Sequence, residues 1–258
     1  QARIVSLAPN VTEMLFAIGA GPDVVGVSSF DTYPPEVASR TKVGGLVDPN
    51  VERILSLKPT LVVAYGSQTE LKARLAGAGI PVFDYAHGSL ADVTATMRAL
   101  GQRLGRAAAA DAAASRVERD LAAVRARVAS LPRPRTLLVF GREAGSIRGI
   151  YVSGGYGFLN DVLDVAGGVN VFADIKRENI QISSEQVLAR APEAIVELRG
   201  PMTPGRLEAE REVWRQLPGV PAVRSGRIHL LQGDWLTVPG PRVAEAARVV
   251  ADALHPPR

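Results

Sequence analysis

The 258-residue chain contains no cysteine. This absence excludes disulfides, thiolate metal sites, iron–sulfur ligation and a cysteine nucleophile. Histidine is also scarce, because only His87, His229 and His255 occur and none is near another in the sequence. A histidine-rich metal site is therefore not expected, and we interpret His229 as a residue within the strand RIHLL. We expect no metal site and no resident cofactor.

Long apolar runs are missing as well. Charged residues, glycine or proline interrupt every hydrophobic stretch before it reaches the roughly 18 residues that a membrane span needs. The composition thus predicts no membrane span. Gln1 opens the sequence and an apolar strand begins within four residues, so we interpret the chain as a mature or trimmed product whose signal peptide has been removed.

No strong excess of charge of one sign is present. The chain has 30 basic and 26 acidic residues, for a net charge of +4. The basic residues alternate with acidic ones along predicted helical faces, as they do between Arg116 and Arg127. This pattern is typical of a solvated helix face, so we expect no nucleic-acid partner.

The signatures of common catalytic sites are also absent. The sequence has no G-x-S-x-G elbow, no G-x-x-x-x-G-K-[ST] loop and no H-E-x-x-H helix. The glycine cluster from Ser153 to Gly157 does not fit the dinucleotide pattern, because Asn160 stands where the third glycine belongs. We interpret the cluster as a loop that starts a helix close to a ligand or strand. We therefore do not expect the protein to be an enzyme. The alternative is an α/β hydrolase or isomerase that uses an Asp and a Tyr in the cleft.

Short apolar strands alternate with helices in both halves of the chain, which is typical of parallel sheets in α/β folds. In the first helix, Thr12 is the expected N-cap and Gly19 the expected stop. Residues 89–131 show no strand signal, and Ala107 to Ser130 predicts one long helix. We therefore predict an α/β fold of two Rossmann-like lobes with central, mainly parallel sheets, joined by one long backbone helix. The lobes comprise residues 1–105 and 132–258, and the helix comprises 106–131.

An internal repeat supports two related lobes. The segments ERILSLKPTLVV and EQVLARAPEAIV begin at Glu52 and Glu185, and each glutamate precedes a proline by seven residues. An apolar strand follows the proline in both segments. This order indicates that the second lobe duplicates the first.

The thirteen aromatic residues are few, and their positions are informative. Seven are predicted at the carboxyl ends of strands or in the loops that follow: Phe30, Tyr33, Tyr65, Tyr85, Tyr151, Tyr156 and Trp235. These strand ends form the ligand crevice of an open parallel sheet. Four arginines are expected at its edge: Arg142, Arg148, Arg199 and Arg242. Such a surface suits a large, flat, partly polar ligand.

Several long segments carry a resemblance that spans nearly the whole chain: RIVSLAPNVTEMLFAIGAG, GVSSFDTYPPEV, NVERILSLKPTLVVAY, the mid-chain helix, SSEQVLARAPEAIV and GDWLTVPGPRVAEAARVVADAL. Together they resemble the helical-backbone substrate-binding proteins (class III) for cobalamin, haem and ferric siderophores. Within that family they are most similar to the periplasmic cobalamin-binding branch, which serves corrinoid ABC importers. The resemblance implies two α/β lobes joined by a rigid helix, an aromatic cleft between them, and delivery of the ligand to a permease dimer.

The resemblance also implies roles for particular residues. Phe30, Tyr33, Tyr65, Asp234 and Trp235 stand where the cobalamin-binding relatives contact their ligand, although Tyr65 replaces a tryptophan. Two further positions, Glu52 and Glu185, match the glutamates that dock on permease arginines. We therefore expect a monomer, periplasmic or tethered by a lipid outside the cytoplasm, that captures cobalamin or cobinamide.

The segment REAGSIRGIYVSGGYGF departs from the cobalamin-binding pattern and leaves the ligand open. A haem carrier needs a tyrosine or histidine as axial ligand, and Tyr65, Tyr151 or Tyr156 is available for that role. A carrier of an anionic siderophore would use the arginines instead.

Overall fold

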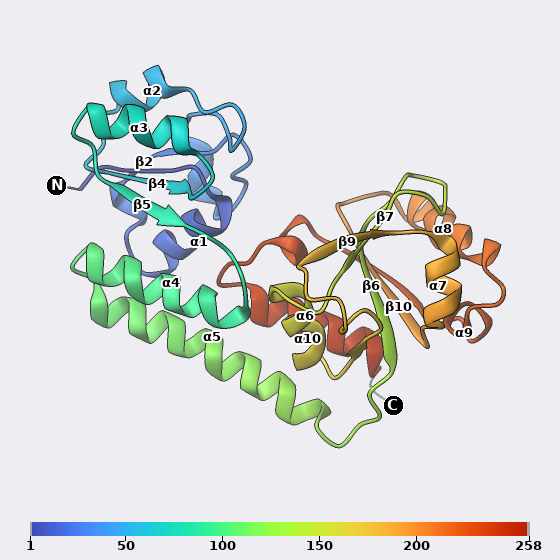
Figure 1. Cartoon of the computed structure of the whole chain (residues 1–258). Coiled ribbons are helices and arrows are strands. Elements are labelled where there is room, and N and C mark those ends of the chain that lie inside the picture. The colour runs from blue at the N-terminus through green and yellow to red at the C-terminus, as the bar shows by residue number, and fades with distance from the viewer. Residues whose placement is uncertain (1, 257–258) are drawn as a thin grey trace. The chain divides into compact units, whose positions relative to one another are not determined.

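The computed structural model describes residues 2–256, which divide into two compact units. Unit 1 contains the chain up to residue 87 together with 91–116, and unit 2 contains 88–90 together with the chain from residue 117 onward. Each unit has its own sheet (Figure 1). In the described part of the chain, no helix is both long enough and apolar enough to cross a membrane.

Unit 1 is built on a sheet in which every neighbouring pair of strands is parallel. Its order is β3-β2-β1-β4-β5, with bounds β1 (Ile4–Ser6), β2 (Val24–Val27), β3 (Thr41–Lys42), β4 (Leu61–Tyr65) and β5 (Val82–Tyr85). β1 and most of β4 are buried on both faces, as expected for apolar runs in a parallel sheet. Because the strands are parallel, their carboxyl ends lie at one edge.

Helices cover this sheet: α1 (Pro9–Ala17), α2 (Val51–Ser56), α3 (Thr69–Gly77), α4 (Leu90–Arg103) and the 3₁₀ helices η1 (Gly21–Asp23) and η2 (Pro35–Ser39). The predicted N-cap of the first helix is wrong, because α1 begins at Pro9 and Thr12 lies inside it, where its hydroxyl bonds the Ala8 carbonyl at 3.3 Å. Proline favours the first helical position, so it sets the start. Gly19 follows the helix with φ +77°, which confirms the predicted stop.

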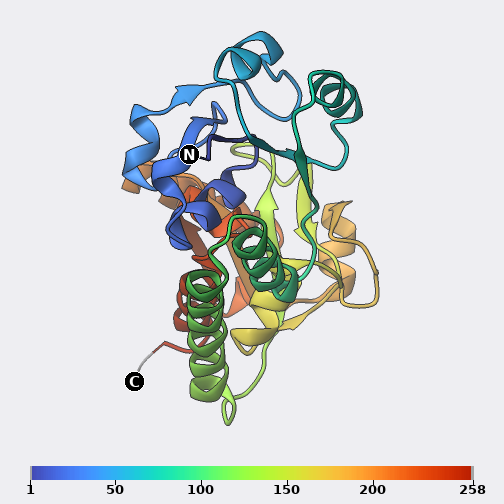
Figure 2. The same ribbon diagram turned by 90° about the vertical axis from the view of Figure 1, so that its left-hand side faces the viewer.

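The mid-chain helical region consists of α4 and the 22-residue α5 (Ala107–Val128), which lie side by side (Figures 1 and 2). Gly105, with φ +67°, lies in the turn between them. A Cβ on Gly101 would lie 2.1 Å from that of Ala110, so this glycine permits the close packing of the two helices. Helix α5 contributes residues to both units, since 107–116 belong to unit 1 and the rest to unit 2. The predicted long helix is confirmed.

Unit 2 has a mixed sheet of order β11-β10-β6-β7-β9, with β8 beside the start of β6. The bounds are β6 (Arg135–Gly141), β7 (Ile150–Ser153), β8 (Val169–Asn170), β9 (Asn179–Ile182), β10 (Ala194–Arg199) and β11 (Ile228–Gln232). β7 is antiparallel to both β6 and β9, whereas β6, β8, β10 and β11 pair in parallel. The mainly parallel pattern therefore holds fully in unit 1 and partly in unit 2.

The remaining helices of unit 2 are α6 (Phe158–Val165), α7 (Ser184–Arg190), α8 (Pro204–Glu212), α9 (Pro221–Arg224), α10 (Val243–Leu254), η3 (Val213–Gln216) and η4 (Asp234–Thr237). Trp214 and Phe172 are its largest fully buried side chains, and they pack with the aliphatic residues of β6, β7 and β10. Unit 2 thus has its own hydrophobic core, separate from the one around Val5 and Val62 in unit 1.

The two copies of the repeated sequence motif also share a backbone conformation before their proline. Lys58 precedes Pro59 with φ 47°, and Ala191 precedes Pro192 with φ 45°. Among residues 2–256 these are the only non-glycine residues with a positive φ. Each ends its helix in the left-handed conformation, and the proline prevents the helix from continuing.

Candidate ligand-binding site

Tyr65 and Tyr85 are the last residues of neighbouring strands in unit 1, and they pair with each other across β4 and β5. Their rings meet edge to face with centroids 5.6 Å apart. Tyr85 is only 3% exposed, and its hydroxyl accepts a hydrogen bond from the Asn10 side chain. Tyr65 is partly exposed. Tyr85 therefore supports the ring of Tyr65 and offers little surface of its own.

The loop after β2 places two further aromatic rings at the same edge of the sheet. Phe30 is 70% exposed and Tyr33 is 43% exposed. The Phe30 amide donates to the Ser28 hydroxyl at 3.2 Å, which fixes the loop as it leaves the strand. Phe30, Tyr33 and Tyr65 together form what we call the aromatic edge of unit 1. Exposed rings of this kind bind flat apolar surfaces.

A buried carboxylate lies in the same loop. Asp31 is 4% exposed, and the Thr12 side chain lies near its carboxylate. Lys42 donates to its backbone carbonyl at 2.7 Å. Burial raises the pKa of Asp31 to about 6. Burial also raises the pKa of the Tyr65 hydroxyl, and the negative charge of Asp31 raises it further.

In unit 2, Asp234 and Trp235 follow β11 and lie in the short helix η4. Asp234 is exposed and Trp235 is half-buried. The guanidinium of Arg242 lies over the indole, 5.8 Å from the ring centroid. Gly233 enters the turn with φ +149°, and a Cβ there would lie 2.5 Å from the Trp235 ring nitrogen. A glycine is therefore needed before this aspartate–tryptophan pair.

Tyr151 and Tyr156 lie at opposite edges of the unit 2 sheet. Tyr151 was expected beyond a strand but is within β7, opposite Gly141 at the carboxyl end of β6, and it is 44% exposed. Because β7 runs antiparallel to β6, it leads from the carboxyl end of β6 toward the amino-terminal end of β6. Tyr156 follows β7 at that amino-terminal edge. The structure thus brings Tyr151, Asp234 and Trp235 to the carboxyl edge and leaves Tyr156 away from it.

The glycine cluster before Tyr156 serves close backbone packing. A Cβ on Gly154 would lie 2.1 Å from the Arg177 carbonyl oxygen, and one on Gly155 would lie 2.1 Å from that of Ala173. Helix α6 begins directly afterwards at Phe158, as predicted. The cluster is therefore required by the neighbouring backbone.

Arg142 does not lie where the sequence suggested. Its side chain is fully buried, with Nε 3.0 Å from Glu197 and a terminal nitrogen 2.9 Å from Glu210. Arg199 joins both glutamates, and the Trp214 ring nitrogen donates to Glu197 at 2.7 Å. These five residues form a buried ion-pair cluster with two charges of each sign. The structure corrects the expectation for Arg142, because no part of its guanidinium is exposed to a ligand.

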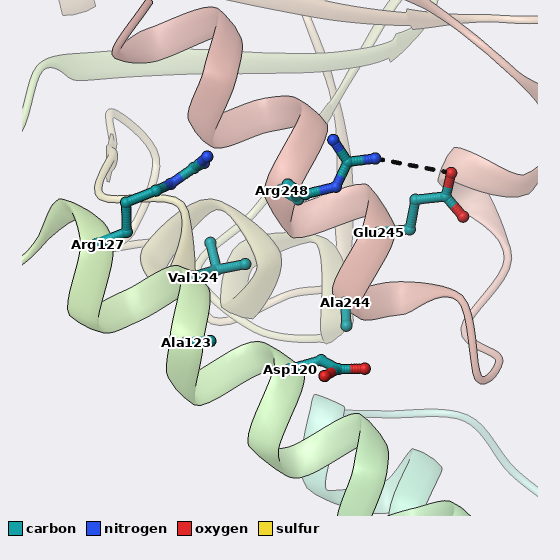
Figure 3. Close-up of a pocket in the computed structure, with 7 residues that line it drawn as sticks. All are labelled: Asp120, Ala123, Val124, Arg127, Ala244, Glu245 and Arg248. Carbon is teal, nitrogen blue, oxygen red and sulfur yellow. Dashed lines mark ion pairs between the residues drawn. The ribbon is translucent and has the colours of Figure 1, made fainter. Parts of the chain in front are cut away.

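A groove of about 460 Å³ runs along unit 2 between α5 and α10 (Figure 3). Its walls are Asp120, Ala123, Val124, Arg127, Ala244, Glu245 and Arg248. Arg127 pairs with Asp252 at 2.7 Å, and Arg248 approaches Glu245 at 3.9 Å. None of the residues expected at the ligand site lines this groove.

The described residues contain no group of three or more His, Asp or Glu side chains placed to hold a metal ion. His229 lies within β11, as predicted, and burial lowers its pKa. The neutral imidazole is therefore favoured in a strand of the unit 2 core.

Glu52 and Glu185 occupy equivalent positions, because each is exposed and is the second residue of its helix. The Asn50 side chain caps α2 by accepting from the Arg53 amide at 2.9 Å. Ser183 caps α7, and a hydrogen bond from the Ser183 hydroxyl lowers the pKa of Glu185. Both carboxylates are thus stabilised by a helix N-terminus and remain accessible.

Sequence reasoning missed Asp31 and Gln68. Asp31 is flanked by aromatic candidates, and that neighbourhood was the only signal for it. Gln68 carries no sequence signal, because its role depends on hydrogen bonds to Tyr65 and Leu46 that only the fold brings together.

Comparison with known proteins defines the class. The family model described as periplasmic binding protein matches residues 4–234. The chain therefore belongs to the periplasmic binding protein family. The vitamin B12-binding protein of Salmonella typhimurium (strain LT2) is 34% identical over 254 residues, covering 98% of this chain and 90% of that protein.

Two further relatives extend the comparison. An ABC transporter substrate-binding lipoprotein of Bacillus subtilis (strain 168), named YvrC and described as uncharacterized, is 31% identical over 259 residues, covering 98% of this chain and 80% of the relative. The solved structure of the periplasmic heme-binding protein RhuT from Roseiflexus sp. RS-1, in its apo form, superposes with a TM-score of 0.82 at 30% identity. That match covers 99% of this chain and 98% of RhuT. The two-unit α/β fold is that of this family.

Proposed function

We propose that the protein is an extracytoplasmic substrate-binding protein that captures a corrinoid, cobalamin or cobinamide, and delivers it to the permease of an ABC importer. The observation that carries this proposal is the aromatic edge of unit 1, where the exposed Phe30 and Tyr33 and the partly exposed Tyr65 lie at or just beyond the carboxyl ends of parallel strands. In open α/β sheets, ligands bind at that edge. The vitamin B12-binding relative supports the corrinoid.

The second unit supplies matching chemistry. Trp235 offers an indole face, Asp234 offers exposed carboxylate oxygens, and Tyr151 offers a second aromatic side chain at the same edge. Aromatic faces desolvate the flat apolar part of a corrinoid, and Asp234 accepts hydrogen bonds from its amide side chains. Preformed contacts of this kind provide affinity without a covalent step, so we propose a binding protein without catalytic turnover.

A haem carrier is the second candidate, supported by the heme-binding RhuT. Tyrosine binds ferric haem iron through its deprotonated oxygen. Burial of Tyr65 raises the pKa of its phenol, and the negative charge of Asp31 raises it further, so both effects oppose deprotonation of Tyr65. Tyr151, which is 44% exposed, is then the more suitable axial ligand. The raised pKa of Tyr65 thus makes this residue a poorer axial ligand for haem iron.

Calorimetric titration with cyanocobalamin, dicyanocobinamide, haemin and a ferric siderophore tests the proposal. We expect one corrinoid per chain with submicromolar affinity. Recovery of the corrinoid chemically unchanged, checked by mass spectrometry, separates a carrier from a hydrolase or isomerase. Tight binding of haemin or a siderophore without corrinoid binding would replace the proposed ligand.

The permease is the proposed partner, supported by the substrate-binding lipoprotein among the relatives. Glu52 and Glu185 are exposed carboxylates in a duplicated motif, one in each unit. Two like charges in equivalent settings match basic residues on the two halves of a permease dimer. We propose that these glutamates dock the loaded protein, which works as a monomer.

A further inference from the structure

Gln68 lies between the aromatic edge of unit 1 and the segment that leads to Glu52. Its side chain is 7% exposed. The amide oxygen accepts from the Tyr65 backbone N–H at 3.0 Å. The amide nitrogen donates to the Leu46 carbonyl at 3.0 Å and to the Gly45 carbonyl at 3.5 Å. A buried amide that uses both of its ends fixes the distance between the two segments it joins.

The same segment also touches Phe30. A Cβ on Gly45 would lie 2.6 Å from a carbon of the Phe30 ring, so the backbone at Gly45 packs directly against that ring. The Ser29 amide donates to the Gly44 carbonyl at 2.8 Å. Two residues of the aromatic edge are therefore linked to the backbone at 44–46: Phe30 through its ring, and Tyr65 through its backbone N–H and the Gln68 side chain.

The segment then continues to α2, the helix that carries the proposed docking residue Glu52. The Asn50 amide donates to the Val43 carbonyl at 2.8 Å, and the Asn50 side chain caps α2. Glu52 follows within the first turn. On its outer side, the segment borders a groove of about 440 Å³ whose walls include Leu46–Pro49 and the first turn of α3. Because this side is open, the segment has room to shift.

We propose that Gln68 is a positioning residue that couples ligand occupancy at Phe30 and Tyr65 to the orientation of the docking residue Glu52. The inference rests on the proposed function and deepens it. A ligand packed on both rings restricts the carboxyl end of β4 and the loop after β2. Gln68 transmits that restriction to Gly45 and Leu46, and thereby to the cap of α2. Coupling between two sites is reciprocal, so docking also favours the bound ligand.

Hydrogen–deuterium exchange of residues 43–56, measured with and without cyanocobalamin, tests the coupling. In the wild-type protein we expect bound ligand to slow exchange throughout this segment. Gln68→Met, which has similar volume and no amide, should bind ligand within a few-fold of wild type and lose the ligand-dependent slowing. Gln68→Glu keeps the acceptor for Tyr65 but turns a carboxylate toward the Leu46 carbonyl, so it should lose the slowing too.

Gln102→Met is the matched control, because Gln102 is an exposed glutamine on α4. It should retain the full ligand-dependent slowing. If Gln68→Met keeps the slowing, the coupling is wrong even when corrinoid binding is established. If only haemin binds, the proposed ligand is wrong and the same comparison with haemin decides the coupling. If neither ligand slows exchange in the wild-type segment, the coupling is overturned.

Discussion

Arg242 covers the indole of Trp235, with the guanidinium carbon 5.8 Å from the ring centroid. A cation over an aromatic face restricts the ring and leaves the opposite face for a ligand. Trp235 is thus held in place at the carboxyl edge of the unit 2 sheet, directly after Asp234.

Trp235→Ala should weaken corrinoid binding by about 1 to 3 kcal/mol, the scale for loss of a buried aromatic anchor. Trp235→Phe should retain most of the affinity because it keeps a stacking surface. Calorimetric titration measures both. Affinity of the alanine variant within twofold of wild type would remove Trp235 from the site.

The pH dependence of stability should report the buried Asp31. Its pKa is about 6 in the folded protein, against an ordinary value of 3.8. The folded state therefore binds the proton more tightly than the unfolded state. The contribution of Asp31 to the free energy of unfolding is fully present below about pH 4 and is lost as pH rises through about 6. Asp31→Asn should match the wild type at pH 4 and exceed its stability at pH 7, by up to about 3 kcal/mol.

Urea unfolding at pH 4, 5, 6 and 7 checks the Asp31 prediction. Asp120→Asn, at an exposed aspartate, is the control and should show no such trend. A constant difference between Asp31→Asn and wild type across this range would contradict the assignment.

Much of the fold could be predicted because its signals are local. The strand RIHLL, the helix stop at Gly19 and the helix from Ala107 depend on residues close in sequence. β7 and β9 were missed, since they are four residues each and lie in a segment interrupted by glycine and arginine. β7 pairs antiparallel with the preceding strand β6 across residues 142–149, and this direction decides where Tyr156 lies.

The candidate site, like the fold, could be predicted only where its signals are local in the sequence. Tyr65 and Trp235 follow apolar strands, so their edge could be inferred from strand direction. Arg142 was misplaced because arginine is usually exposed, and only the fold brings Glu197 and Glu210 to it. Ion pairs between distant residues leave no periodic pattern in the sequence.

Arg142→Met should destabilise the protein by about 3 to 5 kcal/mol, because it leaves two buried glutamates with Arg199 alone. The folded fraction should bind ligand with wild-type affinity, since the side chain is fully buried. Arg148→Met, at an arginine that pairs with Glu143 on the surface, should change stability by less than about 1 kcal/mol. Denaturant unfolding and titration separate these effects. A loss of affinity at unchanged stability would restore Arg142 to the ligand site.

Combined Glu52→Ala and Glu185→Ala substitution should abolish transport by the cognate permease and leave ligand affinity and melting temperature nearly unchanged. Both carboxylates are exposed, and exposed charges mainly set orientation and association rate, so each single variant should lose less. Glu118→Ala with Glu208→Ala, two exposed glutamates outside the repeat, is the control. Normal transport by the double variant would show that the two residues serve only their helix N-termini.

The absorption spectrum of the protein after incubation with cyanocobalamin and gel filtration tests the central claim most directly. We predict that the corrinoid bands elute with the protein at one ligand per chain and that the spectrum remains that of a corrinoid. Protein that elutes without corrinoid, and that retains haemin when treated in the same way, would contradict the account.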